Sequence, residues 1–202
     1  MKKIQAVIYD WGGVLIENPA PALVSFCSKA LGVDQENFSH VWPLCLDDFQ
    51  TGKISEYKFW QKMTKYLKSP MPIVNSLWYN AFVAAYVPVA EMFSIAAHLR
   101  KAGLKIALLS NTEKPAVEFF KSQNYDIFDA AVFSCLEGAK KPDKKIYEIT
   151  LNRLKVPPDD ALFVDDRQDF IDGAKKVGLN AILFQSVEKF KKDLRKFGLN
   201  VV

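Results

Sequence analysis

The sequence predicts an α/β fold, a doubly wound parallel sheet with a helical cap inserted near its start. Three observations carry this expectation. Short apolar runs end abruptly at polar residues, segments with helical spacing separate those runs, and one long stretch near the N-terminus contains helical patterns without a strand. The 202 residues suffice for one core domain with a small insertion, but not for two independent large domains.

The first predicted strand, residues 4–9, is rich in β-branched and aromatic residues. It stops at Asp10, and Gly12 and Gly13 then indicate a tight turn. Four later runs have the same form, at residues 105–109, 130–133, 161–164 and 181–184. Helical spacing marks residues 89–101, 114–123, 143–154 and 169–177, and apolar positions between 187 and 197 predict a final docked helix. Near-continuous apolar strands that alternate with amphipathic helices are typical of a parallel sheet covered on both faces.

Residues 17–87 interrupt this alternation, because they contain four helical patterns, at residues 23–31, 36–46, 55–67 and 74–85, without a clear strand. We therefore expect a core domain of residues 1–16 and 88–202 and a helical cap domain of residues 17–87, with proline-bearing junctions between them. The cap is aromatic, and we expect its rings mainly to hold a small helical unit together. Rings that face a crevice would instead favour an aryl or sugar substrate. The rings concerned belong to Trp42, Trp60, Trp78, Tyr79 and Phe82.

The composition excludes several classes of function. The 27 Lys and Arg residues exceed the 23 Asp and Glu residues only slightly and are scattered, so we expect no nucleic-acid partner. The apolar run that follows Met1, Lys2 and Lys3 is too short for a signal peptide or a membrane span, so we expect no membrane association. Three cysteines without paired spacing predict neither disulfides nor a zinc site, which fits a cytoplasmic protein. The sequence leaves the oligomeric state open.

Polar residues follow three of the predicted strands, and parallel strands present their carboxyl ends to one crevice. These residues are Asp10, the pair Ser110 and Asn111, and the pair Asp165 and Asp166. Three converging carboxylates would repel one another, and a hard divalent cation with oxygen ligands, by default Mg²⁺, is the usual remedy. A carboxylate neutralised in this way can attack a phosphate ester directly and form an aspartyl-phosphate.

One lysine has a positional argument for a role beside these carboxylates. Lys141 directly precedes Pro142, which restricts the backbone before it and opens a predicted helix. We therefore predict that Lys141 holds the phosphate oxygens, whereas the neighbouring lysines decorate a solvated surface.

Four ordered motifs, Y-D-W-G-G-V-L, L-L-S-N-T, G-A-K-K-P-D-K-K-I-Y and F-V-D-D-R, resemble those of the haloacid dehalogenase-like hydrolases. The resemblance runs nearly from end to end and implies a Rossmann-like core, a small helical cap after the first strand, Mg²⁺ and, in most members, phosphatase activity on a small phosphorylated substrate. Residues 52–60 resemble the cap of the branch that includes sugar-phosphate phosphatases and the N-terminal domains of soluble epoxide hydrolases. By motif position, the resemblance implies that Asp10 is both the nucleophile and a metal ligand. It implies further metal ligands at the Gly12 carbonyl and Asp166, and a direct or water-mediated metal contact at Asp165. Phosphate binding falls to Ser110 and Lys141, and Asn111 is a further substrate-binding candidate.

Two positions depart from the family pattern. Most phosphatases of the family carry a general-acid aspartate two residues after the nucleophile, and here that position is Gly12; positioned proton transfer is worth roughly 10² to 10⁴ in rate. Phe170 replaces an asparagine common after the fourth motif. Either the substrates have good leaving groups or the cap supplies an acid, for which the candidates are His40, Asp47, Asp48 and Glu56.

Two alternative functions stay open. A haloacid dehalogenase would use the same nucleophile without a metal, but the paired Asp165 and Asp166 would then repel the carboxylate of a haloacid. A catalytically silent, phosphate-binding regulatory protein would keep the metal site without the acid, and Gly12 is the observation that supports this alternative.

Overall fold

A computed structural model describes residues 3–200, so Met1, Lys2, Val201 and Val202, at the outer ends of the predicted core domain, lie outside the described residues. Five parallel strands form one sheet in the order β3-β2-β1-β4-β5. The strands are β1 (Ala6–Tyr9), β2 (Lys105–Ser110), β3 (Ala130–Phe133), β4 (Ala161–Asp165) and β5 (Asn180–Leu183). The predicted doubly wound parallel sheet is confirmed.

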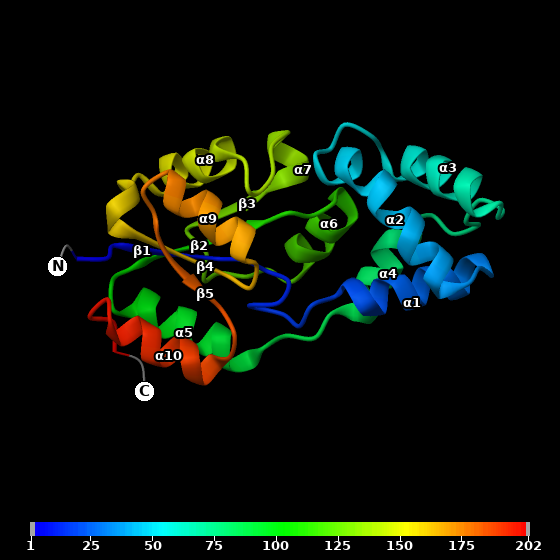
Figure 1. Cartoon of the computed structure of the whole chain (residues 1–202). Coiled ribbons are helices and arrows are strands. Elements are labelled where there is room, and N and C mark those ends of the chain that lie inside the picture. Colours follow the sequence, from blue (N-terminus) through cyan, green and yellow to red (C-terminus); the bar gives the residue numbers. More distant parts are fainter. Residues whose placement is uncertain (1–2, 201–202) are drawn as a thin grey trace.

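Helices cover both faces of the sheet, which explains why its strands are apolar throughout (Figure 1). Val7 and Tyr9 point to the face packed by α5 (Ala90–Lys101), α6 (Lys114–Ser122) and α10 (Val187–Arg195). Ala6 and Ile8 point to the opposite face, packed by α8 (Lys144–Leu154) and α9 (Gln168–Lys176). Two short elements, α7 (Ser134–Glu137) and the 3-10 helix η1 (Pro158–Asp160), complete the connections. The sequence patterns did not predict α7.

Four helices follow β1 and lie beside the sheet, toward the end where its strands terminate (Figure 1). They are α1 (Ala20–Leu31), α2 (Gln35–Gln50), α3 (Glu56–Leu67) and α4 (Leu77–Ala85), close to the four helical patterns of the sequence. Asp34, Ser55 and Ser76 cap α2, α3 and α4, each with a side-chain oxygen that accepts from a backbone N–H. Between residues 20 and 85 the chain forms no strand. The division into two domains stays a prediction, because the apolar cores of this helical unit and of one sheet face are continuous.

The chain leaves the sheet for these helices and returns to it at adjacent places. The Glu17 N–H donates to the Val87 carbonyl and the Val89 N–H donates to the Leu15 carbonyl, both at 2.9 Å. Ile16 and Pro88 form an antiparallel bridge between the two crossings. Within residues 3–200 the structure contains no helix with the length and apolar character that a membrane crossing requires.

Candidate active site

The strands β1, β2 and β4 end beside one another at the middle of the sheet. Here the strand order reverses, because β2 and β3 lie on one side of β1 and β4 and β5 lie on the other. Tyr9 of the central strand lies beside Leu108 of β2 and Val164 of β4, so Asp10 emerges next to the ends of both neighbours. The Asp10 N–H donates to the Val164 carbonyl at 2.9 Å, which fixes the start of the loop. Ligands of open parallel sheets bind at such a reversal, beyond the carboxyl ends of the strands.

Three carboxylates gather at this point. One oxygen each of Asp10, Asp165 and Asp166 lies within 4.8 Å of the others. Asp10 and Asp165 are buried, whereas Asp166 is exposed. Gly13 leaves the space that Asp166 fills, because a Cβ on Gly13 would lie only 2.7 Å from Asp166 Cγ. The predicted convergence of the strand-end carboxylates is therefore present.

A single lysine bridges two of these carboxylates. Lys141 Nζ donates to Asp10 Oδ1 at 2.7 Å and to Asp165 Oδ2 at 2.6 Å, and its side chain is fully buried. The ring of Phe170 lies 4.9 Å from Nζ and that of Phe163 5.5 Å, so the cation also rests among aromatic faces. The departure from the family pattern at Phe170 thus has a packing role beside Lys141.

Asn111 fixes the backbone of this lysine. Its side-chain oxygen accepts from the Lys141 N–H at 2.8 Å, and its side-chain nitrogen donates to the Lys141 carbonyl at 2.9 Å. Both ends of the Asn111 amide are therefore engaged within the protein. A direct contact between Asn111 and a substrate stays a prediction.

Burial and charge set the protonation of the cluster. Burial raises the pKa of Asp10 above its usual range, although Lys141 acts in the opposite direction. Burial also raises the pKa of Asp166, and the neighbouring charge of Asp165 adds to this effect. Burial alone would lower the pKa of Lys141, but its ion pairs with Asp10 and Asp165 prevail and raise it. The lysine is thus a permanent cation between carboxylates that a further positive charge would stabilise.

A cavity of about 310 Å³ opens beside the cluster, between the strand ends and the helices α1, α2 and α4. The cluster side of its lining includes Asp10, Gly12, Ser110, Asn111, Lys141 and Asp166. The helical unit contributes apolar walls from Leu23, Trp42, Leu46, Trp78 and Phe82. Of the five cap aromatic residues singled out from the sequence, Trp42, Trp78 and Phe82 therefore line the cavity as well as pack the helices. The ring centroids of Trp42 and Trp78 lie 5.8 Å apart.

The four candidate acids of the cap lie outside this lining. His40 is exposed and its Nδ1 contacts the Glu36 carbonyl, while Glu56 accepts from Ser76 Oγ and the Trp78 N–H at the start of α4. Asp47 pairs with Lys140, and Asp48 pairs with Lys62 at 2.9 Å. In the described part of the chain, His40 and Glu56 therefore make contacts within and between helices, and Asp47 and Asp48 form ion pairs.

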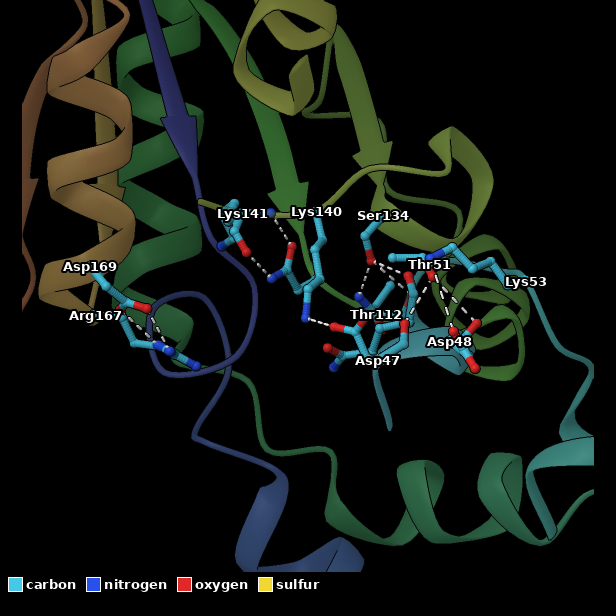
Figure 2. Close-up of polar contacts among 12 residues, drawn as sticks. Asp47, Asp48, Thr51, Lys53, Thr112, Ser134, Lys140, Lys141, Arg167 and Asp169 are labelled. Atoms are coloured by element: carbon cyan, nitrogen blue, oxygen red, sulfur yellow. Dashed lines mark hydrogen bonds and ion pairs between the residues drawn. The ribbon is translucent and has the colours of Figure 1, made fainter. Parts of the chain in front are cut away.

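The helical unit contacts the core through a small polar network (Figure 2). Ser134 Oγ donates to the Gln50 carbonyl at 2.7 Å and accepts from the Thr112 N–H at 2.9 Å. Asp47 and Lys140 form a second contact across the same boundary. These contacts hold the end of α2 against α7 and the segment that follows β2.

Sequence reasoning missed one acidic residue of the cavity, Glu113. It precedes α6, its exposed fraction is 4%, and its Oε2 accepts from Trp78 Nε1 at 3.0 Å. Burial raises its pKa to about 7, although hydrogen bonds from Gln50, Trp78 and Thr112 act to lower it. The sequence feature that could have identified Glu113 is its position, two residues after Asn111, close to the end of a predicted strand.

Comparisons with known proteins agree with this architecture. The model of a hydrolase family, described as haloacid dehalogenase-like hydrolase, matches residues 4–178. Acyl-CoA dehydrogenase family member 10 of Mus musculus is 28% identical over 204 residues, which span 96% of this chain but only 19% of that protein. A sesquiterpene phosphatase of Aspergillus oryzae is 26% identical over 177 residues, 87% of each chain.

A solved structure shows the same fold. An enzyme of the HAD family from Bacteroides thetaiotaomicron superposes with a TM-score of 0.79 at 18% identity, over 96% of this chain and 100% of that one. This likeness concerns the fold alone. Because the family model covers most of the sequence and the motif residues meet at the strand ends, the chain belongs to the haloacid dehalogenase-like hydrolases.

Proposed function

We propose that the protein is a Mg²⁺-dependent phosphatase that hydrolyses a small phosphate monoester through an aspartyl-phosphate on Asp10. The observation that carries this proposal is the meeting of three carboxylates and Lys141 at one wall of a cavity. Its phosphatase relatives support the reaction type, and the sesquiterpene phosphatase does so over 87% of its length. The expected partner is a small phosphorylated molecule in the cytoplasm.

The donor set fits a magnesium ion. Asp10, Asp166 and the Gly12 carbonyl would hold it, with Asp165 in contact directly or through water, and all of these donors are the hard oxygens that Mg²⁺ prefers. When bound, the ion would supply positive charge to the carboxylates and to the phosphate oxygens. The Bacteroides enzyme has been solved as a magnesium complex, which supports the view that this fold accommodates the ion.

The residues of the chain divide the remaining tasks. Asp10 attacks phosphorus, the bond to the leaving alkoxide breaks, and water then attacks the aspartyl-phosphate to release inorganic phosphate and free Asp10. Lys141 and Ser110 hold the nonbridging oxygens, and Asn111 positions Lys141 through its backbone. Lys141 already contacts Asp10, so it also orients the nucleophile.

The leaving alkoxide must find its proton without an acid at position 12. Pro19 occupies the space beside Gly12, because a Cβ on Gly12 would lie 3.0 Å from Pro19 Cδ. A good leaving group needs less protonation in the transition state. We therefore propose that the enzyme acts on esters whose alcohol leaves readily, or that water in the cavity supplies the proton.

The test is hydrolysis of a panel of aryl, alkyl, acyl, sugar and nucleotide phosphates with Mg²⁺ and with a chelator. We expect turnover that requires Mg²⁺ and disappears in Asp10→Asn, whose side chain has the same shape but is a poor nucleophile. Asp172→Asn makes the same change on the exposed side of α9 and should retain activity.

Two outcomes would replace the proposal. Halide release from haloacids in chelator would identify a dehalogenase. A rise in melting temperature with phosphate and Mg²⁺, without turnover of any ester, would identify a silent phosphate-binding regulator, which Gly12 and the closely packed Pro19 would then explain.

A further inference from the structure

Glu113 is a buried acid on the side of the cavity that faces the helical unit. Its carboxylate bonds to Trp78 Nε1 of α4, and Gln50 of α2 and Thr112 also hydrogen-bond to it. The other acids of the cavity, Asp10 and Asp166, belong to the cluster at the strand ends. Glu113 thus lies in the wall that would surround the alcohol of the ester, not the phosphate.

The carboxylate of Glu113 has only neutral partners. Among residues 3–200 no lysine, arginine or histidine forms a salt bridge with it, whereas Lys141 is committed to Asp10 and Asp165. Across the neighbouring α7, burial and then the charge of Glu113 raise the pKa of the Cys135 thiol to about 12, so that group stays neutral. On α6, which Glu113 precedes, Lys114 and Glu118 are exposed.

Apart from the polar partners of Glu113, the helical unit presents apolar side chains to the cavity, and the space is limited. Leu23, Trp42, Trp78 and Phe82 line the cavity opposite the cluster, and the whole cavity measures about 310 Å³. Pockets for small molecules range from roughly 300 to 1,000 Å³, so the alcohol must be small. An apolar wall that contains one uncompensated carboxylate favours a neutral alcohol and opposes a second negative charge.

We propose that Glu113 determines which alcohol the ester carries, by admitting small, neutral, largely apolar alcohols and rejecting those with a second anionic group such as a carboxylate or another phosphate. This inference rests on the proposed phosphatase function and narrows its substrate class. Two like charges about 7 Å apart in a partly buried site repel enough to change kcat/KM by roughly 10- to 100-fold.

The test compares benzyl phosphate with 4-carboxybenzyl phosphate, which differ in charge while their benzylic leaving oxygens are similar. We expect the wild-type protein to favour benzyl phosphate by at least about tenfold in kcat/KM at about pH 8, and Glu113→Gln to reduce this preference by about fivefold or more. Glutamine can still accept a hydrogen bond from Trp78. Glu118→Gln removes one charge from the exposed side of α6 and should leave the preference unchanged.

A second readout separates charge from a merely structural role. Because burial raises the pKa of Glu113 to about 7, the wild-type preference should shrink as pH falls from about 8 to about 6, while that of Glu113→Gln should stay level. The carboxylate of the probe stays ionised in this range. A preference that is equal in wild type and Glu113→Gln, or independent of pH in wild type, would overturn the inference.

Binding distinguishes this inference from the proposed function. Benzylphosphonate and its 4-carboxy derivative resist hydrolysis, and calorimetry with Mg²⁺ should show the same preference and the same effect of Glu113→Gln. Failure to hydrolyse any ester, with the binding preference intact, would reject the phosphatase function but keep the role of Glu113. Hydrolysis or binding without the preference would reject the role of Glu113 alone.

Discussion

Replacing Gly13 with alanine tests the metal site without altering any proposed ligand. Gly13 has a φ of 88°, and a Cβ built on it would lie 2.7 Å from Asp166 Cγ and overlap Oδ2 of the carboxylate. The alanine methyl group must therefore displace the Asp166 side chain. We expect weaker Mg²⁺ binding although Asp10, Asp165 and Asp166 all remain.

The substitution has two costs, one in stability and one in metal affinity. A side chain in left-handed backbone costs roughly 1–2 kcal/mol in stability. Disturbing the support of a metal ligand typically weakens metal affinity by roughly 10- to 100-fold, or about 1.4 to 2.7 kcal/mol. Gly103→Ala is the matched control, because Gly103 has a φ of 91° and no atom within 4 Å of its built Cβ, so only the first cost applies.

The assay combines urea unfolding in chelator with calorimetric titration of Mg²⁺. Both variants should lose similar free energy of unfolding in chelator, and only Gly13→Ala should bind Mg²⁺ more weakly. If Gly13→Ala binds Mg²⁺ as tightly as the wild-type protein, or if Gly103→Ala is weakened equally, Asp166 does not contribute as we reason.

Four further predictions concern Gly12, Lys141 and Glu113. Turnover should rise steeply as the leaving-group pKa falls, because Gly12 offers no proton, and a flat dependence across aryl and alkyl phosphates would contradict this. Gly12→Asp combined with Pro19→Ala should raise kcat for alkyl phosphates by up to roughly 10²- to 10⁴-fold. Gly12→Asp alone should raise kcat less, because the Cβ at position 12 would lie 3.0 Å from Pro19 Cδ. No gain in either variant would show that the lack of a general acid at position 12 does not limit turnover. Lys141→Met should lower the free energy of unfolding in chelator by roughly 3–5 kcal/mol, because it leaves the buried Asp10 carboxylate unpaired, and Mg²⁺ should restore part of the loss. Equal losses with and without Mg²⁺ in urea titrations would argue against Mg²⁺ binding beside Asp10. The pKa of Glu113 rises from 4.5 to about 7 on folding, so the folded state binds its proton more tightly, and the contribution of Glu113 to stability should fall by about 3 kcal/mol as pH rises through that interval. Urea titrations at both ends should show that Glu113→Gln lacks this part of the wild-type slope, and an unchanged slope would refute the assignment.

The sheet was predictable because each strand is a short apolar run that ends at a polar residue. β1 through β5 all lie at predicted positions, since strands buried on both faces leave little freedom in composition. The short α7 was not predicted, because four residues are too few to show helical spacing. The boundary between core and cap stays a prediction, since continuous apolar packing across it has no signature in the sequence.

The candidate site was predictable where backbone position alone decides the geometry. Asp10, Ser110 and Asp165 stand at the ends of adjacent strands, so the topology brings them together whatever their side chains do. Glu113 was missed because its surroundings depend on a side chain 35 residues away in the sequence, Trp78. The engagement of Asn111 with Lys141 is likewise a contact between distant segments, which local patterns do not reveal.

The paired crossings between Leu15–Glu17 and Val87–Val89 have a consequence for how such a chain can diversify. Because the segment that leaves the sheet is hydrogen-bonded to the segment that returns to it, the length of the helical unit between them does not alter the strand order. Insertions, deletions or wholesale exchange there would reshape the wall that meets the alcohol while leaving the carboxylates in place. The helical wall of the cavity can thus change in evolution without a change in the carboxylates at the strand ends.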